Sequence, residues 1–255
     1  MSEAKPSSVP AEPGLYLCKS SEETNKNEIG NVPYREAIGA LLFAARVCRP
    51  DIEYAINYLS QFVDAHNRTH WSAVKQILRY LSGTRDLGIV FGNSGSSCEI
   101  RGYTDADYAG CLETQKSRSG FVFQLNGGPI SWSSQRQSVV SLSTAEAEYI
   151  ALAHGTREAI WLHRILNDLK LPCTSISLFV DNQSAINLAK NSEFHKRSKH
   201  IDVRYHFVRD ILNREIISIN YVASKEQLAD VFTKPLTKQT FCYLRKQLNV
   251  LEHPN

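Results

Sequence analysis

The chain has 255 residues, of which 42% are hydrophobic and 22% charged, and its formal net charge is +3. This length accommodates one large domain or two small ones, and so small a charge does not by itself indicate a nucleic-acid-binding protein. No run of about 18 apolar residues occurs, which argues against a transmembrane helix and a membrane partner. The N-terminus lacks an apolar signal core, and the six cysteines are scattered without metal-binding spacing. We therefore expect an intracellular protein, cytoplasmic or nuclear, with reduced thiols.

The first third of the chain predicts a polar segment followed by a helical subdomain. Residues 1–30 are rich in Ser, Glu, Pro, Asn and Lys, which predicts a disordered N-terminal segment. Within residues 31–92, apolar spacing predicts helices over about 34–47 and from Pro50 to about 62. It also predicts a third helix, with Val74, Ile77, Leu78 and Leu81 on one face and Gly83 as its C-terminal cap. This pattern indicates a small packing subdomain and identifies no function.

The remainder of the chain predicts an α/β domain over residues 98–250, after a polar linker at 93–97. The predicted strands lie near 98–105, 119–125, 129–134, 176–180 and 216–222. The predicted helices lie near 144–169, 182–190 and 200–213, with one or two more from 225 onward. Asn126-Gly127 supplies a hairpin turn between the second and third strands. A three-strand meander followed by alternating helices and strands predicts a mixed sheet with helices against its faces.

Four carboxylates lie in distinct local settings in this domain. Asp105 ends a predicted strand, Glu148 lies early in a helix, Asp181 follows a strand, and Asp230 lies one turn inside a predicted helix. If the fold gathers them, they form an acidic pocket in which like charges repel and raise one another's pKa. Such a pocket is tolerated best around hard divalent cations such as Mg²⁺, which prefers oxygen ligands. Since carboxylate-bound metal pairs cut phosphodiesters, a nuclease is the leading hypothesis.

Each aspartate also has a purely structural interpretation. Asp105 could form a turn, and Asp107 would share its face of the sheet if the strand continued. Asp181 could be a helix N-cap, although ligands of α/β sheets gather at the carboxyl ends of strands, where it lies. Asp230 lies one turn inside a predicted helix that could open with a capping box from Ser224 to Gln227, so capping does not explain it. Its structural alternative is a solvated helical residue.

The two neighbouring glutamates differ in their local roles. Ser143 and Glu146 match a capping box, in which the glutamate bonds back to the backbone of the cap residue. Glu148 has no such role and lies among apolar residues, where a carboxylate is rarely buried without a partner. We therefore favour Glu148 as the functional residue.

Two polar and basic stretches are candidates for gripping nucleic acid. One is Phe194–His200, a basic run with an aromatic residue before a helix, and the other is Ser134–Ser138, next to the helix of Glu148. A solvated charged loop is the structural alternative for the first. If they contact a nucleic-acid backbone, removing one contact should lower the salt slope of binding by about one unit. The predicted nucleic-acid-binding residues are Arg136, Ser138, Asn182, Lys196, Arg197, Lys199 and His200.

Several motifs resemble the ribonuclease H domain of copia-type LTR-retrotransposon Pol polyproteins: SLSTAEAEYIAL, FVDNQSAINLAKN, KRSKHIDVRYHFVRD and QLADVFTKPL. Two more resemble the thumb-like helices that close the reverse transcriptase of the same polyprotein: YREAIGALLFAARVCRPDIEYAINYLSQF and HWSAVKQILRYLSGT. The resemblance spans about residue 30 to the C-terminus. Several motifs in one order make it specific.

The resemblance implies a ribonuclease H fold, with a five-stranded mixed sheet flanked by helices, and hydrolysis of the RNA strand of an RNA–DNA hybrid. The family's catalytic, metal-binding carboxylates correspond to Asp105, Glu148, Asp181 and Asp230. Glu148 matches rather than Glu146, and Asp105 rather than Asp107. Two Mg²⁺ ions would flank the scissile phosphate, one activating water and the other stabilising the leaving oxygen. Mn²⁺ is a workable substitute, and no small-molecule cofactor is expected.

Two departures from the family pattern leave other functions open. No YVDD box occurs, so we expect no DNA synthesis, and the loop Val222–Lys225 lacks the histidine that many ribonucleases H carry there. One alternative is a non-catalytic transposon relic that binds nucleic acid or a protein partner. Another is an integrase-like transferase, which the absence of zinc-binding His/Cys spacing disfavours. The N-terminal helices lack the rest of a polymerase, so we expect exposed apolar surface and self-association.

Overall fold

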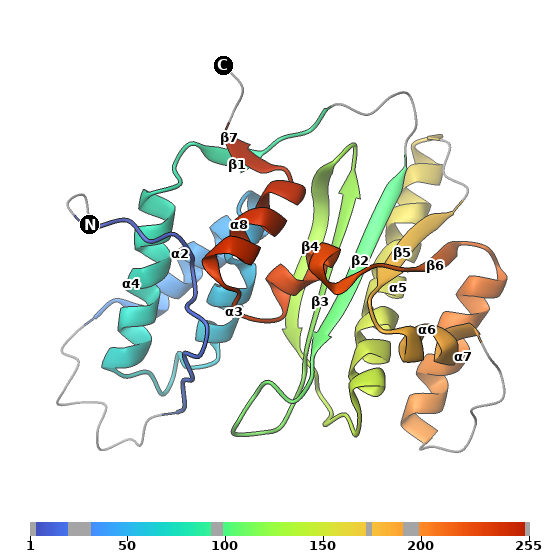
Figure 1. Cartoon of the computed structure of the whole chain (residues 1–255), viewed down its shortest axis with the longest axis horizontal. Coiled ribbons are helices and arrows are strands. Elements are labelled where there is room, and N and C mark those ends of the chain that lie inside the picture. Colours follow the sequence, from blue (N-terminus) through green and yellow to red (C-terminus); the bar gives the residue numbers. More distant parts are fainter. Residues whose placement is uncertain (1–3, 20–31, 93–98, 172–174, 191–198, 253–255) are drawn as a thin grey trace. The chain divides into compact units, whose positions relative to one another are not determined.

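The computed structural model describes residues 4–19, 32–92, 99–171, 175–190 and 199–252 (Figure 1). The chain divides into two compact units, one made of Met1–Val90 with Lys234–Asn255 and the other of Phe91–Thr233. The predicted division placed residues up to 250 in the second domain, whereas the structure groups those from Lys234 with the N-terminal helices. Among the described residues, no helix combines the length and apolar character needed to span a bilayer.

The first unit is mainly helical. Its elements are α2 (Tyr34–Val47), the 3₁₀ helix η1 (Pro50–Ile52), α3 (Glu53–Ser60), α4 (Arg68–Ser82), β1 (Leu87–Ile89), α8 (Lys238–Gln247) and β7 (Val250–Glu252). The predicted helices are present, with the second divided into η1 and α3. β1 pairs antiparallel with β7, so the end of the chain is part of this unit. The helical region predicted after residue 225 thus ends in a strand, β7, that apolar spacing did not predict.

A buried polar network joins α8 to the rest of the first unit. Arg49 donates from Nε and Nη2 to the two carboxylate oxygens of Asp51 at 2.9 and 2.8 Å, and from Nη1 to the Thr84 carbonyl at 3.0 Å. The Tyr80 hydroxyl donates to Asp51 at 2.5 Å and accepts from Arg245 of α8 at 3.1 Å. Burial, together with the charge of Asp51, raises the pKa of the Tyr80 phenol. The paired charges therefore satisfy each other inside the unit.

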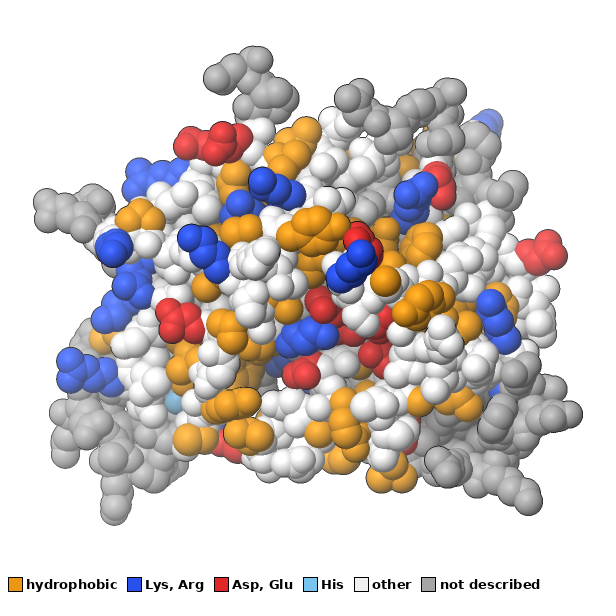
Figure 2. Space-filling view, in the orientation of Figure 1, with side chains coloured by type: hydrophobic (Ala, Val, Ile, Leu, Met, Phe, Trp, Pro, Cys, Tyr) orange, Lys and Arg blue, Asp and Glu red, His pale blue; other side chains and the backbone are white. Residues whose placement is uncertain are grey.

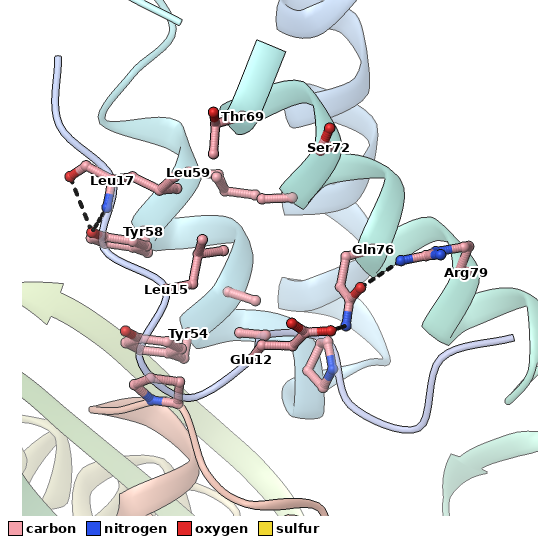
Figure 3. A pocket seen from close by; sticks show the side chains of 15 residues that line it. Glu12, Leu15, Leu17, Tyr54, Tyr58, Leu59, Thr69, Ser72, Gln76 and Arg79 are labelled. Atoms are coloured by element: carbon pink, nitrogen blue, oxygen red, sulfur yellow. Dashed lines mark hydrogen bonds between the residues drawn. The ribbon is translucent and has the colours of Figure 1, made fainter. Parts of the chain in front are cut away.

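Residues 4–19, which composition predicted to be disordered, run along α3 and α4. Gln76 of α4 donates to the Ser7 hydroxyl at 2.9 Å and to the Val9 carbonyl at 3.2 Å, and the Leu17 N–H donates to the Tyr58 hydroxyl at 3.2 Å. This segment encloses a cavity of about 260 Å³ against the two helices (Figure 3). Residues 20–30 lie outside the described part of the chain.

Gly83 ends α4 as predicted, but not in the left-handed conformation that usually favours glycine at a helix end. Its φ is −86°. A Cβ there would lie 2.7 Å from Cβ of Pro6, which belongs to the N-terminal segment. The absence of a side chain at Gly83 therefore lets that segment pass close to the end of α4.

The second unit is built on a mixed five-stranded sheet. Its strands are β2 (Ile100–Asp107), β3 (Arg118–Leu125), β4 (Gly128–Arg136), β5 (Ile176–Val180) and β6 (Ile217–Tyr221), in the spatial order β4-β3-β2-β5-β6. The pairs β2–β3 and β3–β4 are antiparallel, whereas β2–β5 and β5–β6 are parallel. Asn126 and Gly127 form the predicted hairpin turn with positive φ of 50° and 80°. The ribonuclease H-like sheet implied by the sequence is confirmed.

Helices cover this sheet. They are α5 (Thr144–Asp168), α6 (Gln183–Lys190) and α7 (Lys199–Asn213), and α5 packs against β2, β3 and β5 (Figure 1). Small residues allow α5 to approach closely: Ala106 packs against Ala147 and Ala151, and a Cβ on Gly155 would lie 2.4 Å from Cγ2 of Thr104. Because Thr104 and Ala106 face α5, the alternation of β2 directs Asp105 to the other face of the sheet.

His154 lies partly buried on α5. Burial, with a contribution from the charges of Arg157 and Arg204, lowers the pKa of His154 to about 4. Its ordinary value is about 6.5, so the imidazole is neutral in the folded protein at neutral pH. A neutral ring avoids placing a third positive charge beside two arginines.

Candidate metal centre

Asp105 and Asp181 come together because of the register of two central parallel strands. Tyr103 of β2 stands beside Phe179 of β5, and their rings stack with centroids 5.0 Å apart. Asp105 lies two residues after Tyr103 in β2, and Asp181 lies two residues after Phe179, just past the end of β5, so alternation returns both to the face of the stacked rings. The two carboxylates therefore lie at the carboxyl ends of neighbouring strands, the usual ligand-binding edge of an α/β sheet.

Glu148 is supplied by the first turns of α5. The Ser143 hydroxyl caps this helix by accepting from the Glu146 N–H at 3.2 Å. The carboxylate of Glu146 accepts from the Leu142 N–H at 2.9 Å, one residue before the position expected in a capping box. Glu146 thus has a structural role, as predicted, with a different backbone partner. The side chain of Gln137 donates to the Ala147 carbonyl at 2.9 Å, which ties the start of α5 to the end of β4.

The three carboxylates form one cluster. One oxygen each from Asp105, Glu148 and Asp181 lies within 4.8 Å of the others. Asp105 is 2% exposed and Glu148 7%, so these charges are largely removed from water. Figure 2 shows acidic side chains gathered over the sheet near the middle of the face drawn. Such proximity of buried anions calls for compensating positive charge.

The cluster fits a hard divalent cation. Oxygen ligands of Mg²⁺ at about 2.0–2.1 Å in octahedral geometry stand roughly 3–4 Å from one another. The oxygens of Asp105, Glu148 and Asp181 lie within 4.8 Å of one another, which is compatible with that spacing. All three donors are carboxylates, the ligand type that Mg²⁺ and Mn²⁺ prefer. The structure brings these three predicted residues together, and their role as metal ligands stays a prediction.

Asp230 occupies a different kind of element from the one expected. It lies on the 3₁₀ helix η3 (Leu228–Phe232), which follows a second short 3₁₀ helix, η2 (Ser224–Glu226). The predicted capping box from Ser224 is wrong, because Gln227 caps η3 by accepting from the Ala229 N–H at 3.3 Å. Among the described residues, the set of carboxylates within 4.8 Å of one another does not include Asp230. Asp230 is nevertheless buried, at 8% exposure, on a segment that packs against β2 and β3.

The turn role considered for Asp105 and the N-cap role considered for Asp181 belong to the nearby residues Asp107 and Asn182. Asp107 lies within β2, and its Oδ2 is 1.9 Å from the position of a Cβ on Gly110, so its carboxylate points to the following turn. The Asn182 side chain accepts from the Ala185 N–H at 3.0 Å and caps α6. The N-cap role considered for Asp181 therefore belongs to Asn182, a residue expected to bind nucleic acid.

The other predicted nucleic-acid-binding residues are only partly described. Arg136 and Ser138 are exposed at the end of β4, next to the start of α5. Between them, Gln137 is buried and donates to the Ser119 hydroxyl at 2.9 Å, so it serves the fold. Lys196 and Arg197 lie outside the described residues, and so do the side chains of Lys199 and His200 at the start of α7.

Sequence reasoning missed three residues that hold η3 against the sheet. The Gln227 side chain donates to the Thr104 carbonyl at 3.0 Å, and the Thr233 hydroxyl donates to the Asp105 carboxylate. Gly120, opposite Asp105 on β3, leaves room for η3. The motif QLADVFTKPL contains Gln227 and Thr233, but local spacing gives no sign of partners more than 120 residues earlier.

Comparison with known proteins identifies the family. The chain is 44% identical over 244 residues to the retrovirus-related Pol polyprotein from transposon TNT 1-94 of Nicotiana tabacum, covering 94% of this chain and 18% of that protein. It is 36% identical over 254 residues to the corresponding polyprotein from transposon RE2 of Arabidopsis thaliana, covering 98% and 17%. This chain belongs to the copia-type, retrovirus-related Pol polyproteins. It spans about a sixth of the length of these relatives.

Comparisons with family profiles and solved structures add little to this assignment. No protein-family profile matches the chain. The solved LC11 RNase H1 in complex with an RNA/DNA hybrid is similar at 15% identity and a TM-score of 0.41, covering 53% of this chain and 94% of that one. The ribonuclease H-like fold is therefore assigned from the order and directions of its five strands.

Proposed function

We propose that this Pol segment is a metal-dependent endonuclease that hydrolyses the RNA strand of RNA–DNA hybrids. The observation that carries the proposal is the cluster of Asp105, Glu148 and Asp181, whose oxygens lie within 4.8 Å of one another at the carboxyl ends of central strands. The fold and the Pol relatives support a nuclease-like role. The choice of hybrid as substrate comes from the family resemblance of the motifs.

The carboxylates would act as ligands and as an electrostatic frame for the reaction. Asp105 and Asp181 are fixed by strands and Glu148 by a capped helix, so the donors are already oriented before a cation binds. A pair of Mg²⁺ ions held there would supply an activated water and stabilise charge on the leaving oxygen. Asp230 is proposed as the fourth carboxylate. It lies on η3, which follows the other three carboxylates in the chain and packs against β2 and β3. Two cations need more ligands than three carboxylates offer.

The RNA–DNA hybrid would be held mainly through its phosphates. The solved LC11 RNase H1 is described in complex with such a hybrid. In this chain, Arg136 and Ser138 are exposed where β4 leads to the helix of Glu148. An arginine and a hydroxyl are suited to phosphate oxygens, since protein contacts to a nucleic-acid backbone come mostly from such groups. We propose that the helices of residues 31–92 represent the thumb-like segment of the parent polyprotein.

Cleavage of a labelled hybrid tests the proposal. The purified chain is incubated with Mg²⁺ and a hybrid labelled on its RNA strand, beside an equal amount of duplex DNA. We expect cleavage of the RNA strand only, loss of cleavage in Asp105→Asn, and loss on chelation of the metal. Asp107→Asn is the matched control, because Asp107 lies on the same strand and face but points to the turn at Gly110.

Two outcomes would contradict the proposal. Tight binding of the hybrid without cleavage would favour the alternative, a Pol segment that binds nucleic acid without catalysis. Cleavage that persists in Asp105→Asn would mean that the acidic cluster is not the catalytic site, whatever the fold.

A further inference from the structure

We propose that Thr233 is a positioning residue of the metal centre, which fixes the Asp105 carboxylate and links it to the segment that carries Asp230. The inference rests on the proposed function, because it assigns a role within the same site. The Thr233 hydroxyl lies 128 residues from Asp105 along the chain, and the sequence predicted no role for it.

The contacts of Thr233 place it between two of the carboxylate-bearing segments. Its side chain is completely buried, and its hydroxyl donates to Oδ2 of Asp105. The same hydroxyl lies 3.3 Å from the backbone carbonyl of Asp230, which also accepts from the Thr233 N–H at 3.2 Å. A carboxylate that accepts a hydrogen bond from a buried hydroxyl on one oxygen is restrained in rotation, so the direction of its other oxygen is set.

A second hydrogen bond holds the other end of the segment from Gln227 to Thr233 against β2. At its other end, Gln227 is fully buried and donates to the carbonyl of Thr104, the residue before Asp105. The segment from Gln227 to Thr233 is thus bonded at both ends to adjacent residues of β2. Between these anchors it lies over Gly120, where any Cβ would come within 2.8 Å of Phe232 Cβ. Two hydrogen bonds hold η3 against β2, and the missing side chain of Gly120 lets it approach β3 closely.

This arrangement predicts how the hydroxyl affects metal binding. Asp105 must present an oxygen toward Glu148 and Asp181, although the charges of those residues repel it. A hydrogen bond from Thr233 holds the carboxylate in that orientation. Removing a residue that orients a metal ligand lowers metal affinity or activity by about 10–100-fold. We therefore expect a loss of that size on removal of the hydroxyl.

Mn²⁺ titration of the free protein, followed by electron paramagnetic resonance, measures this effect without substrate. Thr233→Val keeps the shape of the side chain and removes the donor, and we expect about 10–100-fold weaker Mn²⁺ binding. Thr233→Ser restores the hydroxyl and should restore affinity. Thr156→Val is the matched control, because Thr156 is also fully buried and its hydroxyl donates to the Leu152 carbonyl within α5. It should bind Mn²⁺ as the unaltered chain does.

The possible results separate this inference from the proposed function. Unchanged Mn²⁺ affinity in Thr233→Val overturns the positioning role and leaves the nuclease proposal intact. If Thr233→Val does not fold, Thr233→Cys replaces it, because cysteine has a similar size and is only a weak donor. Thr233→Cys must then bind Mn²⁺ more weakly, and unaltered Mn²⁺ affinity in this variant overturns the positioning role of Thr233. If the unaltered chain binds Mn²⁺ but cleaves no hybrid, the proposed function fails while the comparison of variants still decides the role of Thr233. Absence of Mn²⁺ binding by the unaltered chain overturns both.

Discussion

Replacing Gly120 by alanine should displace η3 and weaken the metal centre together. Gly120 is the partner of Asp105 across β2 and β3. A Cβ on this residue would lie 2.7 Å from Thr233 Cγ2, 2.8 Å from Phe232 Cβ and 3.2 Å from the Ala229 carbonyl oxygen. Thr233 and Phe232 are fully buried, so neither atom is the free end of a flexible side chain. Strand β3 and η3 must therefore move apart.

The size of the effect follows from these distances. Carbon atoms pack at about 3.5–4.0 Å, so the two closest contacts require a separation of roughly 1 Å. Overpacking of this kind costs about 1–3 kcal/mol, which lowers the unfolding temperature of a unit of this size by roughly 3–10 °C. Because η3 carries Asp230 and ends at Thr233, we also expect weaker Mn²⁺ binding in Gly120→Ala.

Gly39→Ala is a control with the same chemical change and the opposite expected sign. Gly39 is exposed inside α2, and a Cβ there would meet nothing within 4 Å. Alanine in a helix interior is more favourable than glycine by about 0.5–1 kcal/mol. Thermal denaturation and Mn²⁺ titration of both variants test the reasoning. Gly120→Ala with unchanged stability and unchanged Mn²⁺ affinity would refute the packing of η3 described above.

Three further predictions address other parts of the chain. Asp51→Asn leaves the buried Arg49 without its counter-charge, so urea denaturation should show a loss of about 3–5 kcal/mol; a loss under 1 kcal/mol would contradict this. Since folding lowers the pKa of His154 to about 4, stability should fall by about 2 kcal/mol as pH drops from 6.5 to 4, and His154→Gln should flatten that fall. Arg136→Ala should lower the salt slope of hybrid binding by about one unit, and an unchanged slope would exclude its phosphate contact.

The parts of the site that the sequence predicted are those with local signals. Asp105 and Asp181 each follow an apolar run of strand length, and the carboxyl ends of parallel strands meet at one edge of a sheet. Glu148 could be distinguished from Glu146 because the latter had a capping role to perform. The hairpin turn was likewise predicted from two adjacent residues, Asn126 and Gly127. In each case the information lay within a few residues of the feature.

The parts that the sequence did not predict depend on contacts between distant segments. Thr233 and Gln227 bond to residues of β2 more than 120 positions earlier, and no local pattern reports such partners. The segment around Asp230 reads as an α-helix by composition, yet its anchors at both ends hold it as a short 3₁₀ helix. The association of α8 with the first unit includes the hydrogen bond from Arg245 to Tyr80, which apolar spacing alone does not reveal.

Crystals soaked in Mn²⁺ show whether the three carboxylates bind a cation, because anomalous scattering locates the ion without reference to activity. We expect an anomalous peak coordinated by oxygens of Asp105, Glu148 and Asp181, and loss of that peak in Asp105→Asn. A peak elsewhere, or a cluster that stays without Mn²⁺ at millimolar concentration, would contradict the claim that these three carboxylates form a metal centre.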